Sequence, residues 1–126
     1  MSKTAITSPD LAPPAGPFSQ AVVIDGFLFV SGQVAQDPGT GKVVEGGIGP
    51  ETERVFQNLS AVLKAAGRSF DDVVQARVFL TRMIDFAAMN GIYAKHFRQP
   101  FPARTTIGVA TLPLGACVEI DLVVKA

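Results

Sequence analysis

The chain has 126 residues, enough for one hydrophobic core, and its 11 lysine and arginine residues balance 11 aspartate and glutamate residues. This balance argues against binding to nucleic acid or to an anionic membrane surface. One cysteine and one histidine exclude a disulfide framework and make a zinc site of the usual ligands improbable, so no metal is expected. The amino terminus lacks the apolar core of a signal peptide and no apolar run matches a membrane span, which predicts a cytoplasmic protein.

The amino-terminal third predicts an extended segment followed by a hairpin. Residues 1–15 carry several prolines and are expected to be extended. Residues 19–24 and 27–31 are apolar, and the Asp25-Gly26 pair between them suits a two-residue type I′ turn. Residues 36–47 are polar and rich in glycine, which indicates a loop with a short strand at 42–44.

The middle of the chain predicts two helices with a strand between them. Pro50 begins the first helix, apolar residues recur at helical spacing, and Gly67 ends it. Residues 73–81 alternate as a strand, with Val74 and Ala76 on the same face. Asp85 is expected to cap a second helix that runs to about Phe97.

Residues 103–109 and 116–125 form the last two predicted strands. The whole pattern indicates an α+β fold in a single domain over residues 1–126, with one sheet and two helices on one face. Strand segments such as 27–30 are apolar on both faces, and a mean hydropathy of +0.32 is high for a small monomer. We therefore expect another subunit to bury the uncovered face of the sheet.

The strongest candidates for chemistry are Arg104 and Glu119, two charged residues on otherwise apolar strands. A turn-forming connection at residues 112–115 predicts that the last two strands pair as antiparallel neighbours, which brings both side chains to one site. The pair is either a structural ion pair or a site in which Arg104 grips a carboxylate and Glu119 moves protons. Asp121 shares the face of Glu119, so alternation alone does not choose between these two carboxylates.

Three further features have structural explanations of equal or greater weight. Ser31-Gly32 ends a strand, where glycine permits either close approach of a ligand or an ordinary bulge. His96 lies at the end of the second helix, where a cation stabilises the helix dipole. Cys117 has no histidine nearby in the sequence and is expected to be a small buried residue rather than a nucleophile.

Several motifs together resemble the reactive intermediate deaminase (Rid) family, also called YjgF-like, from about residue 13 to the end of the chain. The motifs are Gly16-Pro17-Phe18-Ser19-Gln20-Ala21, Ser31-Gly32-Gln33, Asn90 with Tyr93, Phe101-Pro102-Ala103-Arg104, Val109-Ala110-Thr111-Leu112-Pro113 and Val118-Glu119-Ile120. The Pro-Ala-Arg motif joined to the distal Val-Glu-Ile is fairly specific, whereas Ser-Gly-Gln alone is weak.

The resemblance implies a chorismate-mutase-like fold and a homotrimer whose sheets form a central barrel, with three sites between subunits. It further implies a cofactor-independent hydrolase that converts reactive 2-enamine and 2-imine acids, such as 2-aminoacrylate and 2-iminobutanoate, to 2-keto acids and ammonia. The implied ligand is thus a small 2-imino or 2-keto acid.

Carried over to this chain, the resemblance makes Arg104 the anchor of the substrate carboxylate and Glu119 the residue that positions water and moves protons. Ser31 and Gly32 would line the pocket, with Asn90 and Thr106 at its wall. Phe18 stands where many deaminating members have tyrosine, and Thr106 where several have cysteine.

The loss of the tyrosine hydroxyl leaves a second hypothesis open, a non-catalytic trimer that binds small carboxylates as a sensor or regulator. A third, a ribonuclease, is disfavoured by the zero net charge and the lone histidine.

Overall fold

A computed structural model describes residues 2–126 and contains six strands and two α-helices. In chain order the elements are β1 Thr4–Ile6, β2 Ala21–Ile24, β3 Phe27–Gln33, α1 Ile48–Ala65, β4 Val73–Leu80, α2 Phe86–His96, β5 Ala103–Gly108 and β6 Val118–Lys125. Short 3₁₀ turns precede β4 (Phe70–Asp72), α2 (Met83–Asp85) and β6 (Pro113–Gly115).

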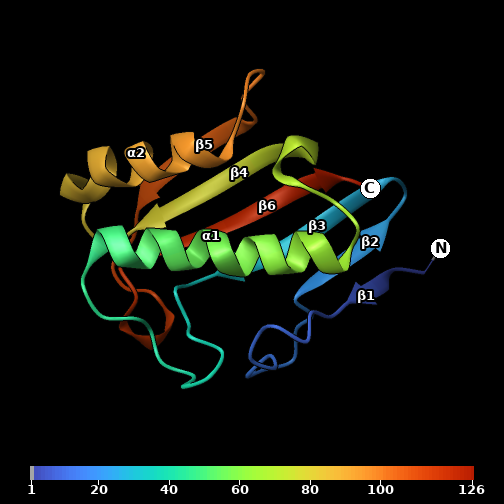
Figure 1. Cartoon of the computed structure of the whole chain (residues 1–126), viewed down its shortest axis with the longest axis horizontal. Helices are drawn as coiled ribbons and strands as arrows, with labels where there is room; N and C mark the ends of the chain where they lie inside the picture. The colour runs from blue at the N-terminus through green and yellow to red at the C-terminus, as the bar shows by residue number, and fades with distance from the viewer. Residues whose placement is uncertain (1) are drawn as a thin grey trace.

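The six strands form one mixed sheet in the order β1-β2-β3-β6-β4-β5. Only β4 and β5 are parallel, because α2 carries the chain back along the sheet between them. Both helices lie on the same face of the sheet, and α1 packs beside α2 (Figure 1). The α+β arrangement with two helices on one face is confirmed.

The predicted hairpin is confirmed in β2 and β3, which pair as antiparallel strands around Asp25 and Gly26. Both turn residues have positive φ, 49° and 82°, as a type I′ turn requires. The third strand of this region lies elsewhere than predicted. Residues 42–44 contribute only an isolated bridge between Gln36 and Val43, whereas Thr4–Ile6 pairs with β2 as an edge strand inside the segment expected to be merely extended.

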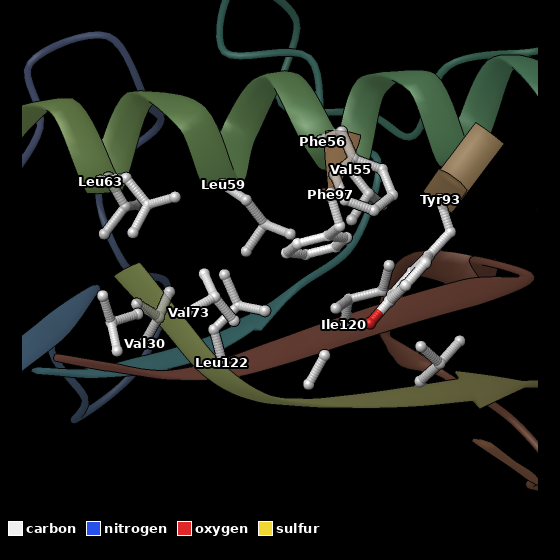
Figure 2. Packing of buried hydrophobic residues seen from close by; sticks show 14 of the residues in the cluster. Val30, Val55, Phe56, Leu59, Leu63, Val73, Tyr93, Phe97, Ile120 and Leu122 are labelled. Carbon is white, nitrogen blue, oxygen red and sulfur yellow. The ribbon is translucent and has the colours of Figure 1, made fainter. Parts of the chain in front are cut away.

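The hydrophobic core lies between the two helices and the sheet. The predicted stripe of α1 faces the sheet, where Leu59 and Leu63 are fully buried over β3 and β6 (Figure 2). Phe56 packs edge-on against Tyr93 of α2. Burial of such side chains contributes ~1.5–3 kcal/mol each. Asp85 occupies the N-cap position of α2, but its side chain makes no capping hydrogen bond, so that part of the prediction is wrong.

The predicted pairing of the last two strands is wrong, because β4 lies between β5 and β6. Pro113–Gly115 therefore does not close a hairpin; β6 runs antiparallel to both β3 and β4 in the middle of the sheet. The alternation predicted for β4 also shifts by one residue at its start. A register shift between Val73 and Gln75 buries Val73 and leaves Val74 exposed.

The face of the sheet that the helices do not cover is rich in apolar side chains. Phe27, Phe29 and Ile107 are exposed on this face. The residues that alternate with them along β3 and β5 point to the side of the sheet that the helices cover. Within residues 2–126, no helix combines the length and the hydropathy required to cross a membrane.

Candidate functional site

The candidate residues fall into two clusters on opposite faces of the sheet. Arg104 is the register partner of Ala76, which is fully buried beneath the helices, so Arg104 points to the helix side. Glu119 pairs with Phe79 on β4, and its chain neighbours Val118 and Ile120 are buried, so Glu119 points to the open face. One chain therefore does not bring Arg104 and Glu119 to a single site, contrary to the strand-pairing prediction.

The first cluster surrounds the Arg104 guanidinium. Nη1 of Arg104 donates a 2.7 Å hydrogen bond to Oδ1 of Asn90, one turn before Tyr93 on α2. The guanidinium also lies over two aromatic rings of α2, 4.7 Å from the centre of Tyr93 and 5.6 Å from that of Phe86. These contacts hold the arginine without an anionic partner, since the salt bridges among residues 2–126 do not involve it. The remaining donors of its planar fork are suited to a carboxylate.

Two hydroxyl groups near this arginine have no hydrogen-bond partner within residues 2–126. Thr106 follows Arg104 by two residues on the same face of β5, and its Oγ1 is buried. The hydroxyl of Tyr93 is likewise buried and unpartnered. Burial raises the pKa of Tyr93, and the charge of Arg104 lowers it by a smaller amount. The phenol thus remains protonated and can donate a hydrogen bond at neutral pH.

The second cluster is a pocket of about 260 Å³ with Glu119 in its wall. Gly32 lies directly beneath the glutamate: a methyl group added to Gly32 would approach Oε2 of Glu119 to 2.5 Å. The β3–β6 register shifts between Val30 and Gln33, so a bulge at Ser31 and Gly32 creates this close approach. Gly32 and Glu119, both expected to belong to the site, therefore lie in contact in the wall of this pocket.

The environment of Glu119 favours the protonated carboxyl group. Burial raises its pKa, and the negative charge of Asp121, two residues away on the same face, raises it further. A carboxyl group with a raised pKa exchanges protons closer to neutral pH than an exposed one does, which is the property that general acid–base chemistry requires. Alternation could not choose between the two carboxylates, but only Glu119 lines the pocket.

Phe18 lines the pocket, but Ser31, which was also expected to line it, does not. The hydroxyl of Ser31 donates to the carbonyl of Ser19 at 2.6 Å and its N–H to the carbonyl of Gln20 at 3.0 Å, so both groups are engaged within the chain. Ser31 faces an adjoining hollow on the open side of the sheet. Phe18 is 54% exposed and lines both cavities.

A buried contact at the start of β6 was not predicted from the sequence. Glu51, in the first turn of α1, is only 7% exposed, and its Oε1 accepts a 3.0 Å hydrogen bond from the N–H of Cys117. Burial raises the pKa of the Cys117 thiol to about 12, with a hydrogen bond to Glu51 adding to the effect. Cys117 is thus a poor nucleophile, and Glu51 holds the strand that carries Glu119 two residues later.

The apolar wall of the pocket was likewise not predicted from the sequence. Residues 11–15 and Leu114 line it, although they belong to segments far apart in the sequence. Asn58 of α1 supports the far side, donating to the carbonyls of Val34 and Gln36 at 3.1 and 3.0 Å. The only sequence signal for the wall of residues 11–15 was its prolines, which predict a rigid extended segment but not the surface that the segment covers. Residues 2–126 contain no group of three or more His, Cys, Asp or Glu residues arranged to hold a metal ion.

Comparisons with known proteins agree over nearly the whole chain. The family model described as "Endoribonuclease L-PSP" matches residues 9–126. A protein of Dermatophagoides farinae named 2-iminobutanoate/2-iminopropanoate deaminase is 42% identical over 125 residues, which cover 98% of each sequence. The crystal structure of RidA from an Antarctic Psychrobacter species is 36% identical, with a TM-score of 0.93, and covers 98% of this chain and 99% of that one. The structure of Escherichia coli TdcF with bound serine is 28% identical, with a TM-score of 0.90 and 98% of both chains covered.

Proposed function

Because this chain belongs to the reactive intermediate deaminase (Rid, L-PSP) family, we propose that it hydrolyses reactive 2-imino and 2-enamino acids to 2-keto acids and ammonia. The family resemblance inferred from the motifs is confirmed, and three relatives that are 42–44% identical to this chain are named 2-iminobutanoate/2-iminopropanoate deaminase. Two observations carry the proposal. Arg104 is fixed by Asn90 and keeps donors free for a carboxylate, and Glu119 has a raised pKa.

The complete site is formed between subunits of a homotrimer. Arg104 and Glu119 lie on opposite faces of the sheet, so one chain offers only half of the chemistry. The exposed Phe27, Phe29 and Ile107 give the open face an apolar surface that a second copy can bury. In the proposed assembly the open faces meet around a central barrel, and the Arg104 cluster of one subunit faces the Glu119 pocket of the next.

Arg104 anchors the substrate through its carboxylate. The hydrogen bond to Asn90 and the stacking on Tyr93 fix the plane of the guanidinium before substrate arrives. A fixed fork forms two parallel charge-assisted hydrogen bonds with a carboxylate and also sets the direction of the C2 atom. Thr106, with its free buried hydroxyl, lies on the wall of this half of the site.

Glu119 supplies the proton transfers of hydrolysis. As the oxygen of water bonds to C2 of the imine, the carboxylate takes the proton of the water and the C=N electron pair moves to nitrogen. The carboxyl group returns that proton to nitrogen, which gives a carbinolamine with OH and NH2 on C2. The carboxylate then takes the hydroxyl proton and passes it to the amino nitrogen, so ammonia leaves with the C–N electron pair as the C2–O bond becomes a carbonyl. A carboxyl group with a raised pKa suits both directions of transfer. Gly32 leaves space for it, and Phe18 adds an apolar border without a hydroxyl.

The ribonuclease named in the family description is a weaker explanation of this chain. Eleven basic residues balance eleven acidic ones, and two of the six arginines, Arg77 and Arg98, are paired with carboxylates. The single histidine stacks on Phe56 with the ring centres 4.2 Å apart, and burial lowers its pKa. RNA cleavage by histidine and a basic groove therefore has little support in this chain.

The test is a competition assay in which a pyridoxal-phosphate dehydratase releases 2-aminoacrylate or 2-iminobutanoate and semicarbazide traps the free imine. We expect the protein to suppress the semicarbazone. Arg104→Ala is expected to lower kcat/KM by about a hundredfold or more, because a lost pair of charged hydrogen bonds is worth ~3 kcal/mol. Arg98→Ala, which removes an arginine that pairs with Asp71 outside both clusters, is the matched control.

Two outcomes contradict the proposal. Normal suppression by Arg104→Ala would exclude the carboxylate anchor. No suppression by the native protein with any amino-acid-derived imine would exclude deamination. Arg104-dependent binding of 2-oxobutanoate in calorimetry would then support the alternative, a trimer that binds small carboxylates without turnover.

A further inference from the structure

Three charged residues, Glu119, Asp121 and Arg77, lie together on the open face of the sheet beside the pocket. Asp121 follows Glu119 by two residues on β6, which places their α-carbons ~6.6–6.8 Å apart on the same face. Arg77 of β4 is the register partner of Asp121, and Phe79 is the register partner of Glu119. Glu119 therefore has Asp121 as its same-face neighbour along β6, and Arg77 lies across from Asp121 on β4, diagonal to Glu119.

Arg77 holds Asp121 in a two-pronged ion pair. Nε of Arg77 donates to Oδ1 of Asp121 at 3.0 Å, and Nη2 donates to Oδ2 at 2.7 Å. The guanidinium also lies 5.7 Å from the centre of the Phe79 ring, so it is held on two sides. The side chain of Asp121 is 17% exposed and that of Arg77 57%. The pair fixes the position of the Asp121 charge on the face that also carries Glu119.

Among residues 2–126, no other charged side chain lines the Glu119 pocket. The β3 residues beneath the glutamate, the wall of residues 11–15 and the turn before β6 contribute uncharged groups. On the open face, the adjoining hollow contains Arg77, Asp121 and Lys3 as its charged residues. Burial is the largest cause of the raised pKa of Glu119, and the negative charge of Asp121 is the second. In the proposed assembly, Arg104 of a neighbouring subunit adds a positive charge that is the same in every variant compared below.

We propose that Asp121 and Arg77 are positioning residues that set the pH at which Glu119 exchanges its proton. Asp121 acts through its negative charge, and Arg77 orients that charge and partly neutralises it. The effect of these residues on catalysis rests on the proposed deaminase function. Their effect on the proton exchange of Glu119 does not depend on that function.

The arrangement predicts opposite effects for the two partners. Asp121→Asn removes the negative charge and keeps nearly the same shape, so the pKa of Glu119 falls. Arg77→Gln leaves Asp121 without its counter-ion, so the pKa of Glu119 rises. Coulomb's law at the ~7 Å between Asp121 and Glu119, with an effective dielectric constant between ~20 and ~80, gives a titration shift of about 0.4 to 1.7 pH units for Asp121→Asn. Arg77→Lys keeps the charge and is expected to restore most of the native value.

The first measurement is an NMR titration of protein labelled with ¹³C at the glutamate side-chain carboxyl, which needs no catalytic turnover. The chain has four glutamates, and Glu119→Gln identifies the signal of Glu119 by its loss. Arg98→Gln and Asp71→Asn are matched controls, since they make the same charge changes in the exposed Asp71–Arg98 pair. They are expected to leave the Glu119 titration unchanged.

The second measurement is the pH dependence of kcat/KM for imine hydrolysis, whose acidic limb should move with the NMR value. Each variant is sized by light scattering, and Asp121→Asn, being nearly isosteric, tests the proposal even if Arg77→Gln alters assembly. Opposite shifts in the NMR titration support the proposal. Unchanged Glu119 titration in Asp121→Asn overturns it. If the variants shift the Glu119 titration in opposite directions but the native protein does not hydrolyse imines, the effect of Asp121 and Arg77 on Glu119 is upheld and the deaminase function is rejected.

Discussion

Replacement of Gly32 by alanine separates catalysis from folding in the proposed mechanism. A methyl group built on Gly32 would lie 2.5 Å from Oε2 and 2.8 Å from Cδ of Glu119. Ordinary contact begins at 3.4 Å, so the carboxyl group must withdraw by about 0.9 Å. A misplacement of ~1 Å at a reacting group lowers the rate by ~10²-fold.

The fold itself should tolerate this substitution. Gly32 is not among the glycines with positive φ, so alanine fits its backbone conformation. The atoms that must move belong to the free end of a flexible side chain. We therefore expect a change of no more than ~1 kcal/mol in the free energy of unfolding.

The assay is the semicarbazide competition, combined with thermal unfolding followed by circular dichroism. Gly91→Ala is the matched control, because a methyl group there meets nothing within 4 Å, and it should keep full activity. In a Glu119→Gln background, Gly32→Ala should add little to the loss, since both changes act through the same carboxyl group. A Gly32→Ala protein within threefold of native kcat/KM would refute this reasoning, and so would a loss that adds in full to that of Glu119→Gln.

Two further predictions concern titratable groups. The fold raises the pKa of Glu119 above its ordinary 4.5, so the stabilisation of the protonated form is complete below the unfolded pKa and is lost as pH rises through the folded value. Glu119→Gln should therefore unfold at a higher temperature than the native protein at pH 8 and at a similar one near pH 4; the reverse order at pH 8 would mean that a positive charge outside this chain holds the glutamate ionised. With a pKa of about 12, Cys117 should carry thiolate in only ~1 molecule in 10⁴ at pH 8 and react with Ellman's reagent at least a hundredfold more slowly in the folded protein than in urea. Equal rates in the two states would show that the buried thiol is freely accessible.

Local patterns in the sequence were sufficient for most of the secondary structure. The Asp25-Gly26 turn, the apolar stripe of α1 and the glycine that ends it depend on residues within a few positions of one another. Those features survive in the structure because backbone geometry and side-chain periodicity act locally. The motifs around Arg104 and Glu119 likewise identified the family.

The arrangement of the site was decided by contacts between distant segments. The position of β4 between β5 and β6 separates Arg104 from Glu119, and no local signal distinguishes that order from a simple hairpin. The pairing of Arg77 with Asp121 follows from the β4–β6 register, and the closeness of Gly32 to Glu119 from the β3–β6 register. The sequence by itself pointed to the residues that are proposed to carry the chemistry, because side-chain identity is local. Only the tertiary structure decided which face of the sheet each occupies, because strand order depends on the burial of the whole apolar surface.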